Sequence, residues 1–147
     1  MDQKVALDTI WVLVTGMLVF FMNLGFGCVE AGFQQSKNCV NILSKNFVVF
    51  AASTIAFWFI GWGLMFGDGN PFVGLQGLLM VGGLDNSPAT GDAYQGVYSA
   101  INWTGVPLSA KFFFQLVFAG TAATIVSGAV GGRIKYFSFI VFSLVLV

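Results

Sequence analysis

The residues of this chain whose types and spacing could do chemistry are few, and two of them share the first apolar run. Glu30 and Asn23 lie seven residues apart, which puts them on one face of a helix. An acid within a membrane-spanning helix is a candidate functional group. The simpler interpretation is an interfacial carboxylate that reaches water or pairs with nearby Lys37. Asn23 is most simply a group that hydrogen-bonds between helices.

Two phenylalanines form the second candidate. Phe114 and Phe118 lie four residues apart, so a helix would present both rings on one face, where they could face a pore. Aromatic residues at helical spacing more often face lipid or a protein core, and the spacing alone leaves both interpretations open.

Small residues recur at every fourth position along the apolar run that contains Phe114 and Phe118. They predict a surface for close helix packing. They are Gly120, Thr124, Gly128 and Gly132. At about 100° per residue, Phe118 lies roughly 200° around the helix from Gly120, so the aromatic pair points away from this packing surface.

The residues that catalysis, metal binding or phosphate binding would need are absent from the sequence. The chain contains no histidine, and we find no nucleophile and base pair, metal-ligand spacing or phosphate-binding glycine loop. Cys28 and Cys39 have neither a second pair nor metal ligands around them. Six basic side chains are balanced by six acidic ones, which gives no nucleic-acid footprint. We therefore predict a protein that is not an enzyme and that uses no metal, cofactor or nucleic acid.

The elements that position these residues are long apolar runs. Hydrophobic residues make up 57% of the chain and charged residues 8%. Residues 9–33, 42–66 and 110–130 are each long enough to span a bilayer, and a fourth run at 136–147 covers about half a span. We predict an all-α membrane protein with three complete transmembrane helices and a truncated fourth. Residues 1–147 then form one membrane unit, expected to be incomplete.

The charges predict an orientation. The connections after the first and third runs carry the bases Lys37, Lys45, Arg133 and Lys135. The connection at 67–109 carries only acids, which are Asp68, Asp85 and Asp92. The positive-inside rule therefore puts the N-terminus and this long connection outside.

Several motifs together resemble a known family. Residues 25–33 (GFGCVEAGF) and 36–38 (SKN) resemble the first-helix signature of the ammonium transporter family, called Amt, Mep and Rh. Residues 62–70 (WGLMFGDGN) resemble the outer end of the second helix. Residues 114–119 (FQLVFA) and 127–133 (SGAVGGR) resemble the third helix and its inner loop. The resemblance covers almost the whole chain.

The resemblance implies a fold and a function. Family members are described as trimers of subunits with about eleven helices, arranged as two inverted halves around a narrow hydrophobic pore. Phe114 and Phe118 match aromatic residues at the outer mouth and gate, where ammonium is recruited before ammonia crosses. Asp68 is expected to add negative potential outside. The implied location is the plasma or inner membrane of a cell.

The chain departs from the family pattern in places. Gly131 and Gly132 stand where members commonly have Ala-Glu, and Gln35 replaces a common arginine. These changes remove possible pairings between the cytoplasmic loops, which counts against docking of the PII-type regulators that some members bind on that face. The pore histidines of the family come from later helices, so a truncated chain is expected to lack them. Two alternatives remain open: an ammonium-sensing membrane module of a signalling protein, and a small four-helix membrane adaptor.

Overall fold

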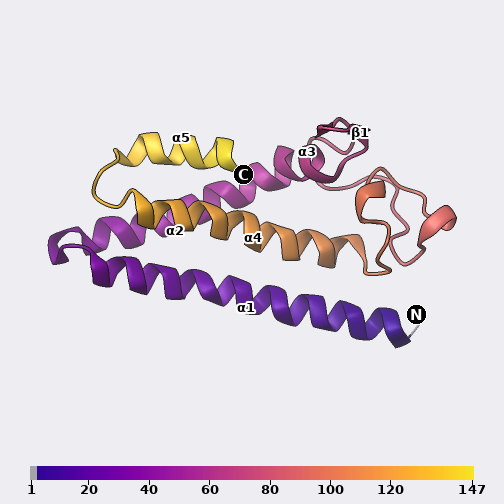
Figure 1. Ribbon diagram of the computed structural model, residues 1–147, viewed down its shortest axis with the longest axis horizontal. Helices are drawn as coiled ribbons and strands as arrows, with labels where there is room; N and C mark the ends of the chain where they lie inside the picture. Colours follow the sequence, from indigo (N-terminus) through magenta and orange to yellow (C-terminus); the bar gives the residue numbers. More distant parts are fainter. Residues whose placement is uncertain (1–2) are drawn as a thin grey trace. The chain divides into compact units, whose positions relative to one another are not determined.

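The computed structural model describes residues 3–147 and is built mainly of helices (Figure 1). Met1 and Asp2, the first residues of the predicted membrane unit, lie outside the described residues. Three stretches of the described chain are long and apolar enough to cross a membrane, and they are Gln3–Phe33, Ser36–Phe66 and Leu108–Ala129. A shorter apolar helix follows at Tyr136–Leu146. The predicted all-α membrane fold is confirmed.

The helix boundaries differ slightly from the predicted runs. Helix α1 spans Gln3–Phe33 and so starts before Thr9, because residues 3–8 continue the helix with their polar side chains exposed. Helix α4 spans Leu108–Ala129 and starts directly after Pro107. The Pro107 carbonyl accepts the Lys111 N–H at 3.2 Å, which satisfies a donor of the first turn.

The second run is not one uniform helix. Helix α2 (Cys39–Ala56) passes into the five-residue π-helical turn η2 (Phe57–Gly61) and then into α3 (Trp62–Phe66). The Phe59 carbonyl in this turn accepts a hydrogen bond from the Met80 N–H at 3.0 Å. The wider turn thus contributes a backbone acceptor to the long connection that follows α3.

Contacts divide the chain into two compact units, which we describe separately. The first unit comprises Met1–Gly16 and Phe57–Gln115, and the second comprises Met17–Ala56 and Leu116–Val147. Helices α1 and α4 each contribute residues to both units.

Aromatic rings form the core of the first unit. Trp62 is fully buried, and its ring lies 4.6 Å from the Phe66 ring, 5.4 Å from Phe112 and 5.7 Å from Tyr98, measured between centroids. The Tyr98 hydroxyl, also fully buried, donates to the Gly82 carbonyl at 3.1 Å. Packing of the Tyr98 ring against Trp62 attaches the long connection to α3. The hydrogen bond to Gly82 joins two parts of the connection itself.

The long connection has little regular structure. Strands β1 (Gly69–Asn70) and β2 (Val73–Gly74) pair antiparallel, and short 3-10 turns occupy Gly91–Ala93 and Ser99–Ile101. A Cβ added at Gly74 would clash with the carbonyl oxygen of Gly63, so the return strand packs against α3 only because a side chain is missing.

The core of the second unit joins α2, α4 and α5. Val49, Ala123 and Phe139 are each fully buried and pack together. Helix α5 (Tyr136–Leu146) contacts α2, beside which it is drawn in Figure 1. The Tyr136 hydroxyl, at the start of α5, lies 3.3 Å from the Ser44 hydroxyl on α2.

Candidate functional site

An aromatic pocket in the first unit is the first candidate site. It has a volume of about 180 Å³, and its lining includes Trp62, Trp103, Phe114 and Lys111. Trp62 is fully buried whereas Trp103 is 78% exposed, so the lining extends from the core of the unit to its surface. Ring faces of this kind attract cations, and tryptophan does so most strongly.

Lys111 supplies the positive charge of the aromatic pocket. Its side chain is only 9% exposed, and Nζ donates to the Ile101 carbonyl at 2.8 Å and to the Thr104 carbonyl at 2.9 Å. An amino group has three N–H donors, so these carbonyls take two of them. Sequence reasoning missed Lys111 because its partners are backbone atoms of the long connection, which no side-chain pattern reveals.

The long connection also carries a carboxylate that interacts electrostatically with Lys111. Asp85 Oδ1 accepts from the Ser87 hydroxyl at 2.6 Å, whereas Oδ2 is buried without a hydrogen-bond partner in the described structure. Burial raises the pKa of the nearby Tyr94 phenol, and the negative charge of Asp85 raises this pKa further. The connection therefore holds a partly unsatisfied acid in the same unit as the buried lysine.

The two predicted entrance residues lie one turn apart on α4 but belong to different units. Phe114 is half-buried and lines the aromatic pocket of the first unit. Phe118 belongs to the second unit and is 42% exposed. Their role at a pore entrance stays a prediction.

Asp68 makes hydrogen bonds that the sequence does not reveal. Its carboxylate oxygen Oδ1 accepts hydrogen bonds from both the backbone N–H and the hydroxyl of Ser99, the former at 3.1 Å. Its backbone N–H donates to the Val97 carbonyl at 2.8 Å. Asp68 thus ties the start of the long connection to the segment that leads toward α4. Its predicted electrostatic role outside stays a prediction.

Glu30 belongs to a buried polar cluster in the second unit, which we call the carboxylate cluster and define as Glu30, Asn46 and Ser127. Their side chains are 7%, 7% and 0% exposed. Asn46 Nδ2 donates to Glu30 Oε2 at 3.0 Å, and the Ser127 hydroxyl donates to the same oxygen at 3.1 Å. Three helices, α1, α2 and α4, therefore meet at one carboxylate.

The carboxylate cluster has further acceptors and a basic neighbour. Glu30 Oε1 and Asn46 Oδ1 are buried without hydrogen-bond partners in the described structure. Lys45, only 4% exposed, interacts electrostatically with Glu30, and its Nζ lies 4.9 Å from the centroid of the Phe139 ring. Lys37, the partner considered from sequence, is exposed in the turn after α1. The signal for Asn46 and Ser127 in the sequence is only their polarity within apolar runs.

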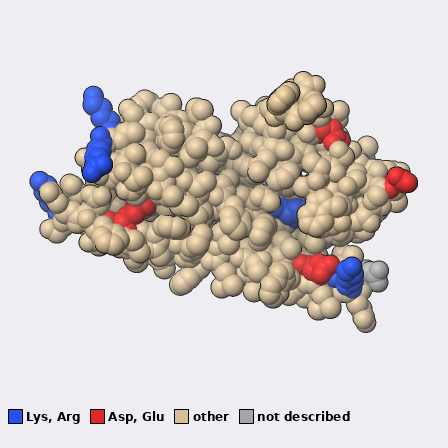
Figure 2. Space-filling model, viewed as in Figure 1, with Lys and Arg blue, Asp and Glu red and all other residues tan. Residues whose placement is uncertain are grey.

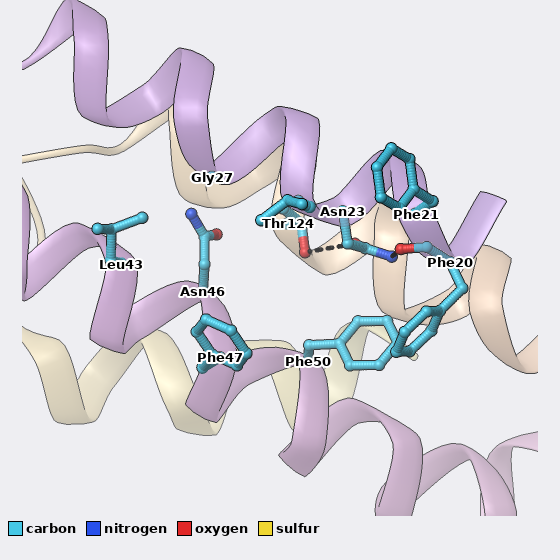
Figure 3. Close-up of a pocket in the computed structure, with 10 residues that line it drawn as sticks. Phe20, Phe21, Asn23, Gly27, Leu43, Asn46, Phe47, Phe50 and Thr124 are labelled. Carbon is cyan, nitrogen blue, oxygen red and sulfur yellow. Dashed lines mark hydrogen bonds between the residues drawn. The ribbon is translucent and has the colours of Figure 1, made fainter. Parts of the chain in front are cut away.

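A second cavity, of about 290 Å³, lies in the second unit (Figure 3). Its walls are mainly apolar, including Phe20, Phe47 and Phe50, and two polar residues of the lining, Asn23 and Thr124, point toward each other in the view. The Thr124 hydroxyl donates to Asn23 Oδ1 at 3.2 Å, and Asn23 Nδ2 donates to the Thr121 hydroxyl at 3.3 Å. Asn23 therefore joins α1 to α4, in the interhelical role considered from sequence.

The predicted packing residues meet different neighbours. A Cβ added at Gly120 would clash with the ring of Phe50, and one at Gly128 would lie 3.2 Å from Glu30 Oε1. Thr124 is buried between them. Gly132 lies beyond the end of α4 with φ of +71°, so it forms part of the turn rather than of the helical surface. The small residues therefore share one helical face only as far as Gly128, because the backbone leaves the helical conformation before Gly132.

Charged side chains are sparse on the face that Figure 2 shows, and most of that surface is uncharged. The second unit contains four bases, Lys37, Lys45, Arg133 and Lys135, and one acid, Glu30. The acids of the long connection, Asp68, Asp85 and Asp92, all belong to the first unit. No group of three or more potential metal ligands occurs among residues 3–147.

Comparison with protein families gives one match that covers most of the chain. The family described as "Ammonium Transporter Family" matches residues 10–147. Among solved structures, one titled "Sensor Amt Protein" aligns with a TM-score of 0.79 and 30% sequence identity, and the alignment covers 100% of this chain and 33% of that one.

Curated relatives come from distant organisms. Ammonium transporter Amt2 of Archaeoglobus fulgidus is 36% identical over 146 residues, which are 99% of this chain and 27% of that protein. A putative ammonium transporter of Synechocystis sp. is 40% identical over 92% of this chain and 21% of its own length. Putative ammonium transporter 1 of Caenorhabditis elegans is 37% identical over 88% of this chain and 21% of its own length. The chain thus spans between a fifth and about a quarter of these relatives.

Proposed function

The chain belongs to the ammonium transporter family, and from that premise we propose that its complete gene product carries ammonium nitrogen across a membrane. The observation that carries the proposal is the family match over residues 10–147, supported by relatives named as ammonium transporters. The three apolar spans make the chain a multi-pass membrane protein, as a transporter requires. The family is one of transporters rather than enzymes.

We place recruitment of the ion at Phe114 and Phe118. A cation that sheds its water loses hydration energy, and an aromatic ring face returns about 0.5–2 kcal/mol of it through a cation–π interaction. A bare charge in the middle of the membrane stays strongly unfavourable. The ion is therefore held at the entrance, and neutral ammonia crosses the apolar stretch. The lining of the aromatic pocket by Phe114 supports this assignment.

The distribution of charge supports an orientation with the N-terminus outside. The four bases of the second unit flank the turns after α1 and α4, whereas the long connection carries acids. Basic connections stay on the cytoplasmic side of plasma and bacterial inner membranes, the locations we propose. Asp68 then contributes negative potential on the outer side, where it attracts cations. In this scheme Glu30 holds α1, α2 and α4 together through the hydrogen bonds of the carboxylate cluster.

The family resemblance also supports assembly as a homotrimer. A PII-type regulator would meet the cytoplasmic turns at Gln35 and Gly131, where the chain departs from the family pattern. A Cβ added at Gly131 would lie 2.5 Å from the Gln34 side-chain amide, so these two turns lie against each other. A substitution at Gly131 would therefore disturb both turns at once.

An uptake assay tests the proposal. Cells that lack their own ammonium transporters, when they express the complete gene, should take up ammonium and methylammonium with saturation. Phe118→Ala should weaken apparent affinity for the cation by about three- to tenfold, which corresponds to the loss of one cation–π contact. Phe137→Ala serves as the matched control, because Phe137 is a 76% exposed ring on α5. Equal saturation in both variants would remove Phe118 from the entrance.

A second candidate function is ammonium sensing. The match to a structure titled "Sensor Amt Protein", at 30% identity over the whole chain, favours it. The scaffold would be the same, and a signalling domain elsewhere in the gene would distinguish the two functions. Reading the complete gene for a kinase or cyclase region decides between them.

A further inference from the structure

Lys111 is itself an ammonium group held inside the aromatic pocket. It lies on α4 three residues before Phe114, slightly less than one helical turn, and Phe114 lines the same pocket. The side chain is 91% buried, and Nζ donates to the carbonyls of Ile101 and Thr104 at 2.8 and 2.9 Å. Two backbone carbonyls that line the pocket therefore accept hydrogen bonds from the lysine of the same pocket.

Free ammonium and a lysine amino group need the same partners. Both are compact cations whose N–H donors seek oxygen acceptors, and both are attracted to ring faces. The aromatic pocket provides carbonyl oxygens together with the rings of Trp62, Trp103 and Phe114. It therefore has the composition of an ammonium-binding site, and a tethered ammonium group occupies its oxygens.

One further buried polar group of the lining is a donor. Trp62 is fully buried, and its Nε1 has no hydrogen-bond partner in the described structure. An N–H group offers a cation nothing, but it can donate to the lone pair of an uncharged ligand such as ammonia or water. With Lys111 in place, its positive charge repels a second cation from the pocket.

We propose that Lys111 is a built-in competitor of the transported cation, which fills the carbonyl site of the aromatic pocket and thereby sets how weakly the first unit binds free ammonium. This inference rests on the proposed function, since it concerns the same substrate. Asp85, which acts on Lys111 electrostatically, helps to keep the amino group there. The residue is then a determinant of affinity and selectivity.

Binding measurements on the purified complete protein test the proposal. Ammonium chloride and methylammonium chloride are titrated at constant ionic strength while tryptophan fluorescence is recorded, with sodium chloride as the blank. Lys111→Met removes the charge at similar length and should bind methylammonium at least about tenfold more tightly than the unchanged protein, because a like charge has left the site. Lys111→Arg keeps the charge and should bind as the unchanged protein does.

A second neutral variant protects the test from misfolding. Lys111→Gln retains an amide that can donate to the Ile101 and Thr104 carbonyls, so it should fold. It removes the charge but still occupies the carbonyls, and it should therefore show a smaller gain in methylammonium binding than Lys111→Met. Circular dichroism and size-exclusion chromatography establish which variants are folded. If a folded neutral variant binds methylammonium no better than the arginine variant, the proposal is overturned.

Uptake by cells separates this inference from the proposed function. Uptake by the unchanged protein, combined with equal binding by all variants, would sink the inference about Lys111 alone. Absence of uptake in every variant would sink the transport proposal, while the fluorescence titration would still decide whether Lys111 blocks a cation site. Tighter binding and a lower half-saturation concentration in the neutral variants would support both.

Discussion

The two units bury one lysine each, and they compensate the buried charge by different means. In the first unit, Lys111 donates to two backbone carbonyls at 2.8 and 2.9 Å. In the second, Lys45 lies 4.9 Å from the centroid of the Phe139 ring and interacts electrostatically with Glu30. A charge away from water is tolerated only where such groups replace the lost hydration.

This difference determines what each unit depends on. The carbonyls that hold Lys111 come from the long connection, so its environment exists only while that connection keeps its conformation. The groups around Lys45 are side chains on helices, and they remain in place as long as the helices pack. The first unit should therefore respond to changes in the connection, and the second to changes in buried side chains.

The largest effect is expected at the carboxylate cluster. Glu30→Ala removes the acceptor of Asn46 and Ser127 and leaves Lys45 without its acid. We expect a loss of about 3–5 kcal/mol in the free energy of unfolding, as for other buried pairs that lose one partner. Unfolding of the purified complete protein in detergent, followed by circular dichroism against denaturant, measures this loss.

A matched variant separates the charge of Glu30 from its hydrogen bonds. Glu30→Gln keeps an oxygen that accepts from Asn46 and Ser127, and so it should lose less than half as much stability as Glu30→Ala. Equal losses in both variants would mean that the pairing of charges, rather than the hydrogen bonds, holds the three helices together.

A smaller effect distinguishes the two lysines directly. In a double-mutant cycle, Glu30→Gln and Lys45→Met should couple by about 1–2 kcal/mol, because each charge is the other's compensation. The cycle of Asp85→Asn and Lys111→Met should couple by no more than about 0.5 kcal/mol, since backbone carbonyls already satisfy Lys111. Both cycles use the same unfolding measurement.

The comparison of the units fails if the second coupling equals or exceeds the first. Asp85 would then be the principal partner of Lys111, and the two units would compensate their lysines in the same way. Lys135→Met provides the control for an exposed base, and we expect it to change stability by less than about 0.5 kcal/mol.

The helices could be predicted from sequence because hydropathy and length determine them. The runs at 9–33 and 110–130 correspond to α1 and α4 within a few residues. The π-helical turn within the second run was not predicted, since its residues are as apolar as their neighbours. Its Phe59 carbonyl accepts a hydrogen bond from Met80, which lies in the distant connection. Periodicity does not report which backbone groups a distant loop will need.

The candidate site was predictable only where side-chain type carries the signal. Phe114, Glu30 and Asn23 were found as unusual or regularly spaced residues, and each lines a cavity or joins the carboxylate cluster. Lys111 was missed because its environment is made by carbonyls 7 and 10 residues away in an irregular segment. The bond between Asp68 and Ser99 was missed for a related reason, since 31 residues of irregular chain separate them.

The most local effect tests whether the first unit depends on its connection. Asp68→Ala removes the oxygen that accepts both the backbone N–H and the hydroxyl of Ser99, and we expect a loss of about 1–2 kcal/mol. The loss should be local: hydrogen exchange of the Ser99 and Ile101 amides should become faster, while exchange in α2 of the second unit should not change.

Asp92→Ala is the control, because Asp92 is an exposed acid of the same connection and its loss removes the same charge. If Asp68→Ala accelerates exchange in α2 as much as at Ser99, the connection supports both units and the contrast between them is wrong. If exchange becomes faster at Ser99 and Ile101 but not in α2, the segment that carries the Ile101 and Thr104 carbonyls has become more mobile. Lys111 would then lose its partners although its own helix stays intact, which the comparison of the two lysines requires.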